Sequence, residues 1–232
     1  MKVNSHSIVA MALLPSMVLV GHGAFAQTTA TVAETGTIAG VTTNLQLPVN
    51  NVRDYFVGSQ NITVNGSSFL AYCVDPFQYA SGTPATYNVY SGFAGTQFAG
   101  QRATDMTTLY SQYFASTSGN ATLVNNQNSA AFQLALWELA NDDGVLTAGG
   151  VQRTGSTDSD VVTLASTMIT NAKTGVTGPT QYAFTVYKHQ TQQDFLVSVT
   201  AVPEPETYAM LLSGLGLIGV IARRRKGFAV TV

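Results

Sequence analysis

Cysteine is nearly absent from this chain, because its 232 residues include only Cys73. A single cysteine cannot close a disulfide within the chain. Histidine is also scarce, and His6 and His22 precede residue 27, which leaves His189 for the rest of the protein. A zinc site of Cys and His ligands is therefore excluded, and we see neither a nucleophile elbow nor a glycine-rich phosphate loop. We expect no metal and no cofactor.

Charged residues are few as well, at 9% of the chain. Between Gln27 and Glu206, five basic residues stand against 12 acidic ones, a net charge of −7. Nucleic-acid binding depends on neutralising phosphates with Lys and Arg, so we expect no nucleic-acid partner. Abundant Thr, Ser, Asn, Gln and Gly are typical of a secreted β-rich protein.

The first 26 residues have the layout of a secretory signal peptide. Lys2 supplies the positive start, residues 8–20 are an apolar run, and Ala24-Phe25-Ala26 is a small-x-small cleavage site. The apolar run is too short for a stable membrane span. We therefore predict an N-terminal signal helix over residues 1–26 and export through the inner membrane.

The C-terminal segment has three parts, which in chain order are Pro203-Glu204-Pro205, an apolar stretch over residues 207–222, and the basic cluster Arg223-Arg224-Arg225. The prolines disfavour a helix before residue 206, so a hydrophobic helix must follow them. Sixteen apolar residues are marginal for a bilayer that needs about 20. The basic cluster is expected to stay on the cytoplasmic side. This arrangement favours a transient anchor in the inner membrane by residues 207–222.

These three parts resemble the PEP-CTERM sorting signal of Gram-negative bacteria. The resemblance implies that a membrane-embedded exosortase cuts near Pro203-Glu204-Pro205 and releases or transfers the protein to the cell surface or the extracellular polymer. It divides the chain into a signal peptide (1–26), a β-rich domain (27–202), a sorting signal (203–226) and a short tail (227–232).

Local patterns predict a mixed, β-rich α+β fold for residues 27–202. Two alternating runs over residues 61–74 flank Asn65-Gly66, which is typical of a tight hairpin. Apolar residues recur at helical spacing over residues 103–115, 129–140 and 160–172, with Ser129 as a cap, and alternation returns over 181–188 and 194–202. Residues 27–40 have no periodicity and are expected to form a loose arm. We predict a β-sandwich or barrel core with an inserted helical portion.

Cys73 and Gln133 are the two residues that the predicted fold leaves unexplained. Alternation places Cys73 with Phe69 and Ala71 on the inward face of its strand. Gln133 lies among apolar helical residues, four positions before Trp137, and a buried carboxamide without partners is costly. One interpretation is a half-exposed glutamine beside an amphipathic tryptophan.

The segments YCVD (72–75) and FQLALWEL (132–139) resemble the paired motifs of bacterial thioester domains. In that family an aromatic-Cys strand motif precedes a hydrophobic-Gln-x-x-x-Trp motif, and the Cys sulfur joins the Gln side-chain carbonyl in an internal thioester. The resemblance implies a thioester between Cys73 and Gln133. Tyr72 becomes the aromatic neighbour and Trp137 the wall of the bond. Proton transfer to an incoming group would fall to Asp75, Glu138 or His189.

Two functions follow. In the first, the protein is an adhesin-like covalent binder, whose thioester is attacked once by an amine or hydroxyl of a surface protein or polysaccharide. Bond formation without turnover is not enzymatic. The alternative is a noncovalent structural component of the extracellular matrix, with Cys73 a buried small hydrophobe. An intermolecular disulfide and a Cys73–His189 nucleophile pair are further interpretations of the thiol.

Overall fold

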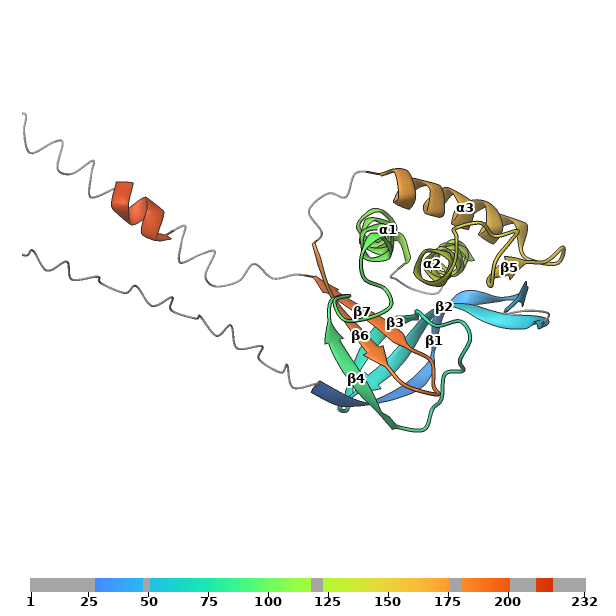
Figure 1. The fold of residues 1–232 in the computed structure, drawn as a ribbon, viewed down its shortest axis with the longest axis horizontal. Coiled ribbons are helices and arrows are strands. Elements are labelled where there is room, and N and C mark those ends of the chain that lie inside the picture. The colour runs from blue at the N-terminus through green and yellow to red at the C-terminus, as the bar shows by residue number, and fades with distance from the viewer. Residues whose placement is uncertain (1–27, 48–50, 118–122, 176–180, 201–211, 219–232) are drawn as a thin grey trace, which may run out of the picture.

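The computed structural model describes residues 28–47, 51–117, 123–175, 181–200 and 212–218 (Figure 1). Within this part of the chain lie the strands β1 (Thr28–Gln46), β2 (Val52–Val64), β3 (Ser67–Cys73), β4 (Ala85–Ser91), β5 (Gln152–Arg153), β6 (Tyr182–Lys188) and β7 (Phe195–Thr200). The helices α1 (Gln101–Thr117), α2 (Leu123–Asn141) and α3 (Ser159–Thr174) follow β4 and precede β6. The mixed, β-rich architecture with inserted helices agrees with the prediction.

The strands form one antiparallel sheet in the order β2-β3-β7-β6-β4-β1-β5. Strand β1 pairs with β4 through residues 28–32 and with β2 through residues 32–46, so the sheet closes on itself. This pairing matches the barrel alternative rather than the two-sheet sandwich. The closed sheet and the three helices form two layers, with the helices over one side (Figure 1).

The hairpin between β2 and β3 is confirmed. Asn65 and Gly66 have φ angles of 49° and 85°, and the left-handed conformation of both residues is the one that a type I′ turn requires. The register then places Ile62 opposite Phe69 and Gln60 opposite Ala71. The hairpin thereby carries the strand that ends at Cys73 into the centre of the protein.

The loose arm predicted for residues 27–40 is wrong, because residues 28–40 lie in β1. Their side chains lack strict alternation, but β1 has strand neighbours along its length, and the main-chain ladder supplies the stabilisation. Small residues allow β1 and β2 to approach closely. A Cβ at Gly40 would lie 2.3 Å from the Val57 carbonyl oxygen, and one at Gly58 would lie 2.2 Å from that of Ala39.

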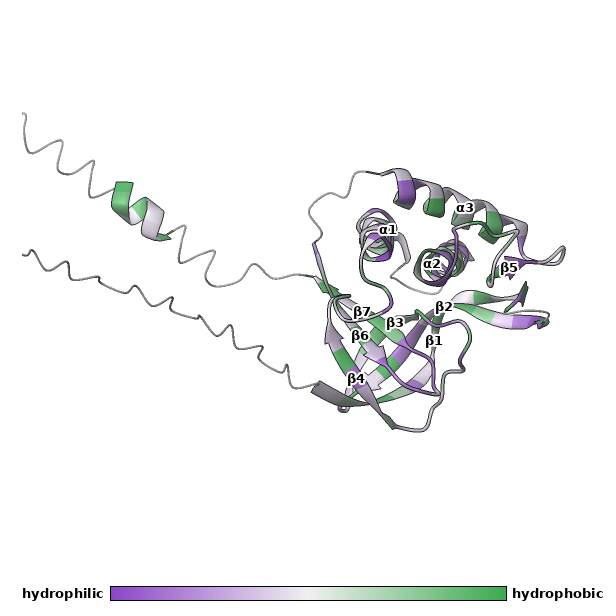
Figure 2. Ribbon diagram, viewed as in Figure 1, coloured by the Kyte–Doolittle hydropathy of each residue, from purple (hydrophilic) through white to green (hydrophobic). Residues whose placement is uncertain are grey.

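The helical predictions are confirmed for α1 and α3, while α2 begins earlier than expected. Helix α2 starts at Leu123, so Ser129 lies inside the helix and does not cap it. Every residue of 130–140 is buried, because α2 packs on β1, β2 and β3 and also contacts α1 and α3. Apolar residues recur on these helices and on the strands beneath them (Figure 2). A helix surrounded in this way is fixed in rotation, and its side chains point in defined directions.

Beyond residue 200, the structure describes residues 212–218. The signal peptide, Pro203-Glu204-Pro205 and Arg223-Arg224-Arg225 lie outside the described residues. Residues 212–218 of the apolar stretch are helical. Among the described helices, none combines the length and apolar character needed to cross a bilayer.

Candidate functional site

Cys73 is the last residue of β3, where the strand has a neighbour on one edge only. On the β7 side it pairs with Phe195, and the next residue, Val74, donates its N–H to the Asp194 carbonyl oxygen at 2.9 Å. On the opposite side the ladder with β2 ends at the pair Gln60 and Ala71. Since N–H and C=O groups alternate between the two edges of a strand, those of Cys73 point to the edge that β2 has left.

The Gln133 side chain fills this place. Its Oε1 accepts the Cys73 N–H at 2.9 Å, and its Nε2 donates to the Cys73 carbonyl oxygen at 2.7 Å. Only one orientation of the amide satisfies both bonds, so the positions of oxygen and nitrogen follow from the partners. Gln133 and Cys73 are each 1% exposed, and the interpretation of Gln133 as a half-exposed residue is therefore wrong.

The contact belongs to a stripe along α2 whose members, Ser129, Gln133, Trp137 and Asn141, are four residues apart. Residues at this spacing lie on one face of a helix. The hydroxyls of Ser129 and Tyr72 share a hydrogen bond of 2.8 Å. The Asn141 side chain donates to the Val74 carbonyl oxygen at 2.7 Å. Three polar side chains of one helix therefore hold three consecutive residues, 72–74, and fix the register between α2 and β3.

Ser129 also ties α2 to β2. Its hydroxyl accepts the Ser59 N–H at 3.1 Å and contacts the Ser59 hydroxyl at 3.3 Å. The Ser59 hydroxyl continues to the Ala39 carbonyl oxygen at 3.2 Å. All these groups are buried, where satisfied polar networks impose one arrangement.

Trp137, the remaining member of the stripe, lines a surface pocket. The pocket has a volume of about 340 Å³ and is walled by β1, β2, residues 76–80 and α2. Gln60 and Trp137 both line it. Gln60 pairs with Ala71, two residues before Cys73, and Trp137 is one turn from Gln133. The pocket therefore lies beside the pair.

The thiol of Cys73 is held in its neutral form. Burial raises the Cys73 pKa well above the ordinary value, and the negative charges of Glu34 and Asp75 raise it further. A thiolate is the nucleophilic form of cysteine, so burial lowers the reactivity of the free thiol toward groups in solution.

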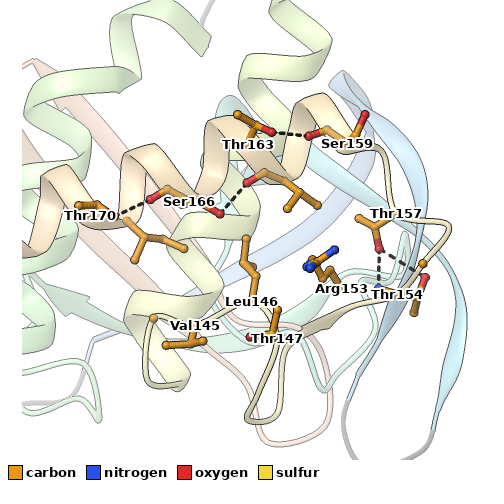
Figure 3. A pocket seen from close by; sticks show the side chains of 14 residues that line it. Val145, Leu146, Thr147, Arg153, Thr154, Thr157, Ser159, Thr163, Ser166 and Thr170 are labelled. Atoms are coloured by element: carbon orange, nitrogen blue, oxygen red, sulfur yellow. Dashed lines mark hydrogen bonds between the residues drawn. The ribbon is translucent and has the colours of Figure 1, made fainter.

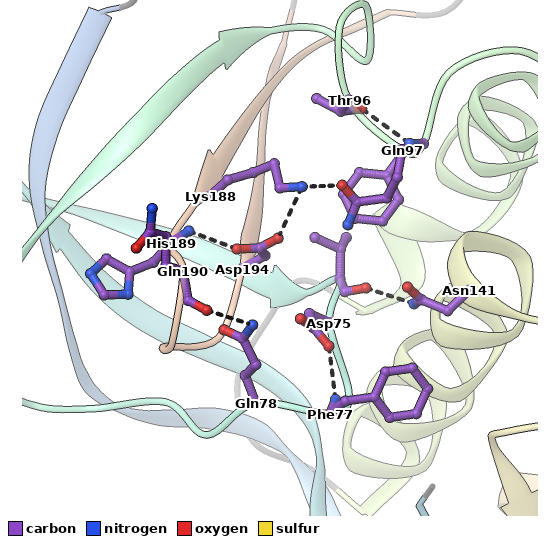
Figure 4. A network of polar contacts seen from close by, with 12 residues as sticks. Asp75, Phe77, Gln78, Thr96, Gln97, Asn141, Lys188, His189, Gln190 and Asp194 are labelled. Carbon is purple, nitrogen blue, oxygen red and sulfur yellow. Dashed lines mark hydrogen bonds and ion pairs between the residues drawn. The ribbon is translucent and has the colours of Figure 1, made fainter.

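Asp75 and His189, two of the candidates for proton transfer, have structural contacts instead (Figure 4). The Asp75 carboxylate accepts the Phe77 N–H at 2.9 Å. The His189 Nδ1 accepts N–H groups of Thr191 at 3.2 Å and Gln192 at 3.0 Å. These bonds shape the turns after β3 and after β6.

Asp194 is a buried carboxylate that sequence reasoning missed. It accepts the His189 N–H at 2.8 Å and lies 3.8 Å from the Lys188 ammonium group (Figure 4). Burial raises its pKa to about 6, a shift that the His189 N–H and Lys188 partly offset. Its position in the β6–β7 connection indicates that it holds the segment paired with Cys73.

Glu138 lies in a cavity other than the pocket beside Trp137. This cavity has a volume of about 80 Å³ and is lined by α1, the end of α2 and Lys173. Burial raises the Glu138 pKa to about 8, and the charges of Asp142 and Asp143 act in the same direction. The main-chain N–H groups of Gly144 and Val145 partly oppose the shift.

A larger cavity, of about 540 Å³, lies between α3 and the segment before it (Figure 3). Its hydroxyl groups are engaged with the protein itself. Thr163 donates to the Ser159 carbonyl oxygen, Ser166 to that of Val162, and Thr170 to that of Ser166, at 2.8 to 2.9 Å. Because these hydroxyls already donate to main-chain carbonyl oxygens, they are weak candidates for a catalytic or binding role.

The sequence contained a signal for the polar stripe that its interpretation missed. Ser129 was predicted to cap the helix, and Asn141 lies just beyond the predicted helix end at residue 140, although both stand four-residue steps away from Gln133. Polar residues repeated at this interval along an otherwise apolar helix indicate a common partner. Gln60, in the middle of β2, gave no comparable signal.

Comparison with protein families finds the PEP-CTERM protein-sorting motif over residues 201–226. The motif marks the chain for export and for exosortase-mediated sorting to the cell surface. A comparison with curated protein sequences gives no match.

Among solved structures, the neighbours are domains of bacterial surface proteins. The N-terminal domain of the Streptococcus pyogenes pilus tip adhesin Cpa aligns with a TM-score of 0.44 and 14% identity, over 72% of this chain and 99% of that one. The N-terminal thioester domain of a Clostridium perfringens surface protein aligns with a TM-score of 0.44 and 14% identity, over 75% of this chain and 100% of that one. The N-terminal thioester domain of a protein F2-like fibronectin-binding protein from Streptococcus pneumoniae aligns with a TM-score of 0.42 and 9% identity, over 74% of this chain and 94% of that one.

Proposed function

We propose that the exported protein forms an internal thioester between Cys73 and Gln133 and uses it to capture a surface partner covalently. The observation that carries this proposal is the pair of hydrogen bonds between the Gln133 amide and the main chain of Cys73 in a buried site. With the amide fixed, χ1 of Cys73 is the torsion that sets the distance from the sulfur to the amide carbon. This is the geometry of proximity catalysis.

The hydrogen bonds also match the charge changes of thioester formation. Attack by sulfur turns Oε1 of Gln133 into an oxyanion, and the Cys73 N–H at 2.9 Å is placed to stabilise it. The amide nitrogen then leaves as ammonia and takes the thiol proton, so no external acid or base is consumed. The product is neutral, which avoids the cost of a buried thiolate.

Opening of the thioester would attach the partner. An amine or hydroxyl attacks the acyl carbon, the carbon–sulfur bond breaks, and the proton of the incoming group ends on the Cys73 sulfur. The partner stays on the Gln133 side chain as an amide or ester. The site then has no route back, so the protein acts once and is not a turnover enzyme.

The rest of the chain fits delivery to the cell surface. We propose that residues 27–202 are the thioester-bearing domain and that residues 207–222 hold it transiently in the inner membrane until an exosortase acts at the sorting motif. Burial of Cys73 and Gln133 would protect the bond from water during export.

Intact mass of the secreted protein, with its signal peptide removed, tests the proposal. We expect a species lighter than the sequence mass by one ammonia and a thiol that does not react under denaturing conditions. Methylamine should add its full mass and free the thiol. The variants Cys73→Ala and Gln133→Ala should have their full sequence masses, whereas Gln112→Ala, on the exposed face of α1, should still lack one ammonia.

Full mass together with a titratable thiol in the wild-type protein would overturn the proposal. It would leave a sorted surface protein that contributes to the extracellular matrix through noncovalent contacts. Circular dichroism of each variant checks that the fold is retained.

A further inference from the structure

The pocket beside the Cys73–Gln133 pair contains buried polar atoms with no hydrogen-bond partner among the described residues. They are Oε1 of Gln60, Oε1 of Gln78 and Nε1 of Trp137. Gln60 is 8% exposed and Trp137 is 3% exposed. Leaving such an atom unsatisfied costs about 1–3 kcal/mol, so a cluster of three beside one pocket calls for a ligand.

The mixture of donors and acceptors restricts that ligand. Two carboxamide oxygens require donors, and the indole N–H requires an acceptor. An ammonium group has three donors and no acceptor, so it can satisfy the glutamines but not Trp137. Hydroxyl groups donate and accept, and a ligand with several hydroxyls can satisfy all three atoms.

The charges around the pocket disfavour an anionic ligand. The Arg53 guanidinium group lies 4.7 Å from the Tyr79 ring centroid and 5.0 Å from that of Tyr55, and so places a fixed cation at the pocket wall. Glu34 and Asp54 also line the pocket, and Asp54 accepts a bond from Asn44 at 3.2 Å. One cation and two carboxylates leave a single net negative charge, which disfavours an acidic sugar. The indole N–H of Trp137, which requires an acceptor, is what disfavours an ammonium group.

The shape is suitable for a sugar. A volume of about 340 Å³ is within the usual range for small-ligand pockets, about 300–1,000 Å³. The Tyr79 ring, 60% exposed, offers an apolar surface at the wall. Residues from β1, β2, the loop after β3, α2 and the β6–β7 connection converge on this space.

We infer that this pocket binds a neutral sugar unit of a polysaccharide. Binding itself is independent of the thioester, whereas the covalent step rests on the proposed function. In that step a sugar hydroxyl oxygen bonds to the Gln133 acyl carbon, the carbon–sulfur bond breaks, and the hydroxyl proton passes to the Cys73 sulfur. Gln60, Gln78 and Trp137 thereby select a carbohydrate partner for the site.

The experiment uses the Cys73→Ala protein, which cannot form the thioester, so that sugar binding is measured alone. Saturation-transfer NMR is recorded with maltohexaose, cellohexaose and chitohexaose, and titration gives the dissociation constant. We expect saturable binding of at least one oligosaccharide. Gln60→Leu and Gln78→Leu should each weaken it about tenfold, the effect of one lost hydrogen bond of ordinary strength. Trp137→Phe, which keeps a ring and removes the N–H, should weaken it as well.

Gln112→Leu, outside the pocket, is the matched control and should bind with wild-type affinity. Thermal melts identify any variant that has lost its fold, and the two glutamine variants keep the test valid should Trp137→Phe unfold. The inference is overturned if none of the three oligosaccharides binds. It is also overturned if Gln60→Leu and Gln78→Leu bind them with wild-type affinity. Preferential, pocket-dependent binding of hexylamine or of trigalacturonate overturns it in favour of an amine or an acidic sugar. The mass of the wild-type protein reports on the thioester separately.

Discussion

Replacement of Glu138 by glutamine should remove a pH dependence from the stability of the protein. Glu138 is 0% exposed, and the main-chain N–H groups of Gly144 and Val145 stabilise its carboxylate only in part. Burial, followed by the charges of Asp142 and Asp143, raises its pKa from 4.5 to about 8. Between these values the unfolded chain is ionised while the folded protein keeps the proton. Unfolding therefore releases a proton, and stability falls by about 1.4 kcal/mol for each pH unit as the pH rises.

The window from pH 6.5 to 8 isolates this group. Asp194, with a pKa raised to about 6, gives a slope of the same sign at lower pH and is mostly ionised from pH 6.5 upward, so it adds little across the window. Urea unfolding at pH 6.5, 7.25 and 8 should show the wild-type protein losing about 2 kcal/mol across the window, whereas Glu138→Gln stays nearly constant. Glu34→Gln, at a half-exposed carboxylate, should follow the wild type. If the free energy of unfolding falls with pH equally in Glu138→Gln and the wild type, the reasoning is refuted.

Two further predictions concern the stripe on α2. Asn141→Leu removes the 2.7 Å bond to the Val74 carbonyl oxygen and should lower the free energy of unfolding by about 1–3 kcal/mol in urea titrations; an unchanged value would show that the bond adds nothing. Ser129→Ala removes the buried partner of the Ser59 N–H and one of the partners of the Tyr72 hydroxyl, at a similar cost. Because Tyr72→Phe removes one of the two groups that bond to Ser129, the double variant should be about 1 kcal/mol more stable than the sum of the single effects, and strict additivity would contradict the network.

Local chemistry predicted the elements that are stabilised locally. The Asn65-Gly66 turn and the apolar periodicity of α1 and α3 depend on neighbours within a few residues, and all of them were found in the sequence. Strand β1 was missed, because its stabilisation comes from pairing with β2 and β4, which lie far from its first half in sequence. The early start of α2 was missed for a related reason, since residues 123–128 are mostly polar and extend a helix that tertiary packing already holds.

In the candidate site, too, some features could be predicted from the sequence and others could not. The proximity of Cys73 and Gln133 could be anticipated only through resemblance to a family, because 60 residues separate them and no local rule joins a strand to a later helix. Glu138, the residue after Trp137, was predicted as a candidate for proton transfer at the thioester. On a helix, adjacent residues differ in direction by about 100°, and this difference sends Glu138 into the cavity beside α1 while Trp137 faces the pocket.

The spacing of the stripe bears on how the reactive bond could form without loosening the protein. Loss of ammonia removes the Nε2 donor, so the Cys73 carbonyl oxygen loses its 2.7 Å bond at a cost of about 1–3 kcal/mol. Ser129 and Asn141 hold α2 to β3 on either side of Gln133 and are untouched by the reaction. Because they fix the helix on both sides, the proposed change would stay confined to one residue, and the acyl carbon would keep its position beside the pocket before and after capture. A glutamine on a loop would lack these two anchors, and a middle position on a buried helix supplies them.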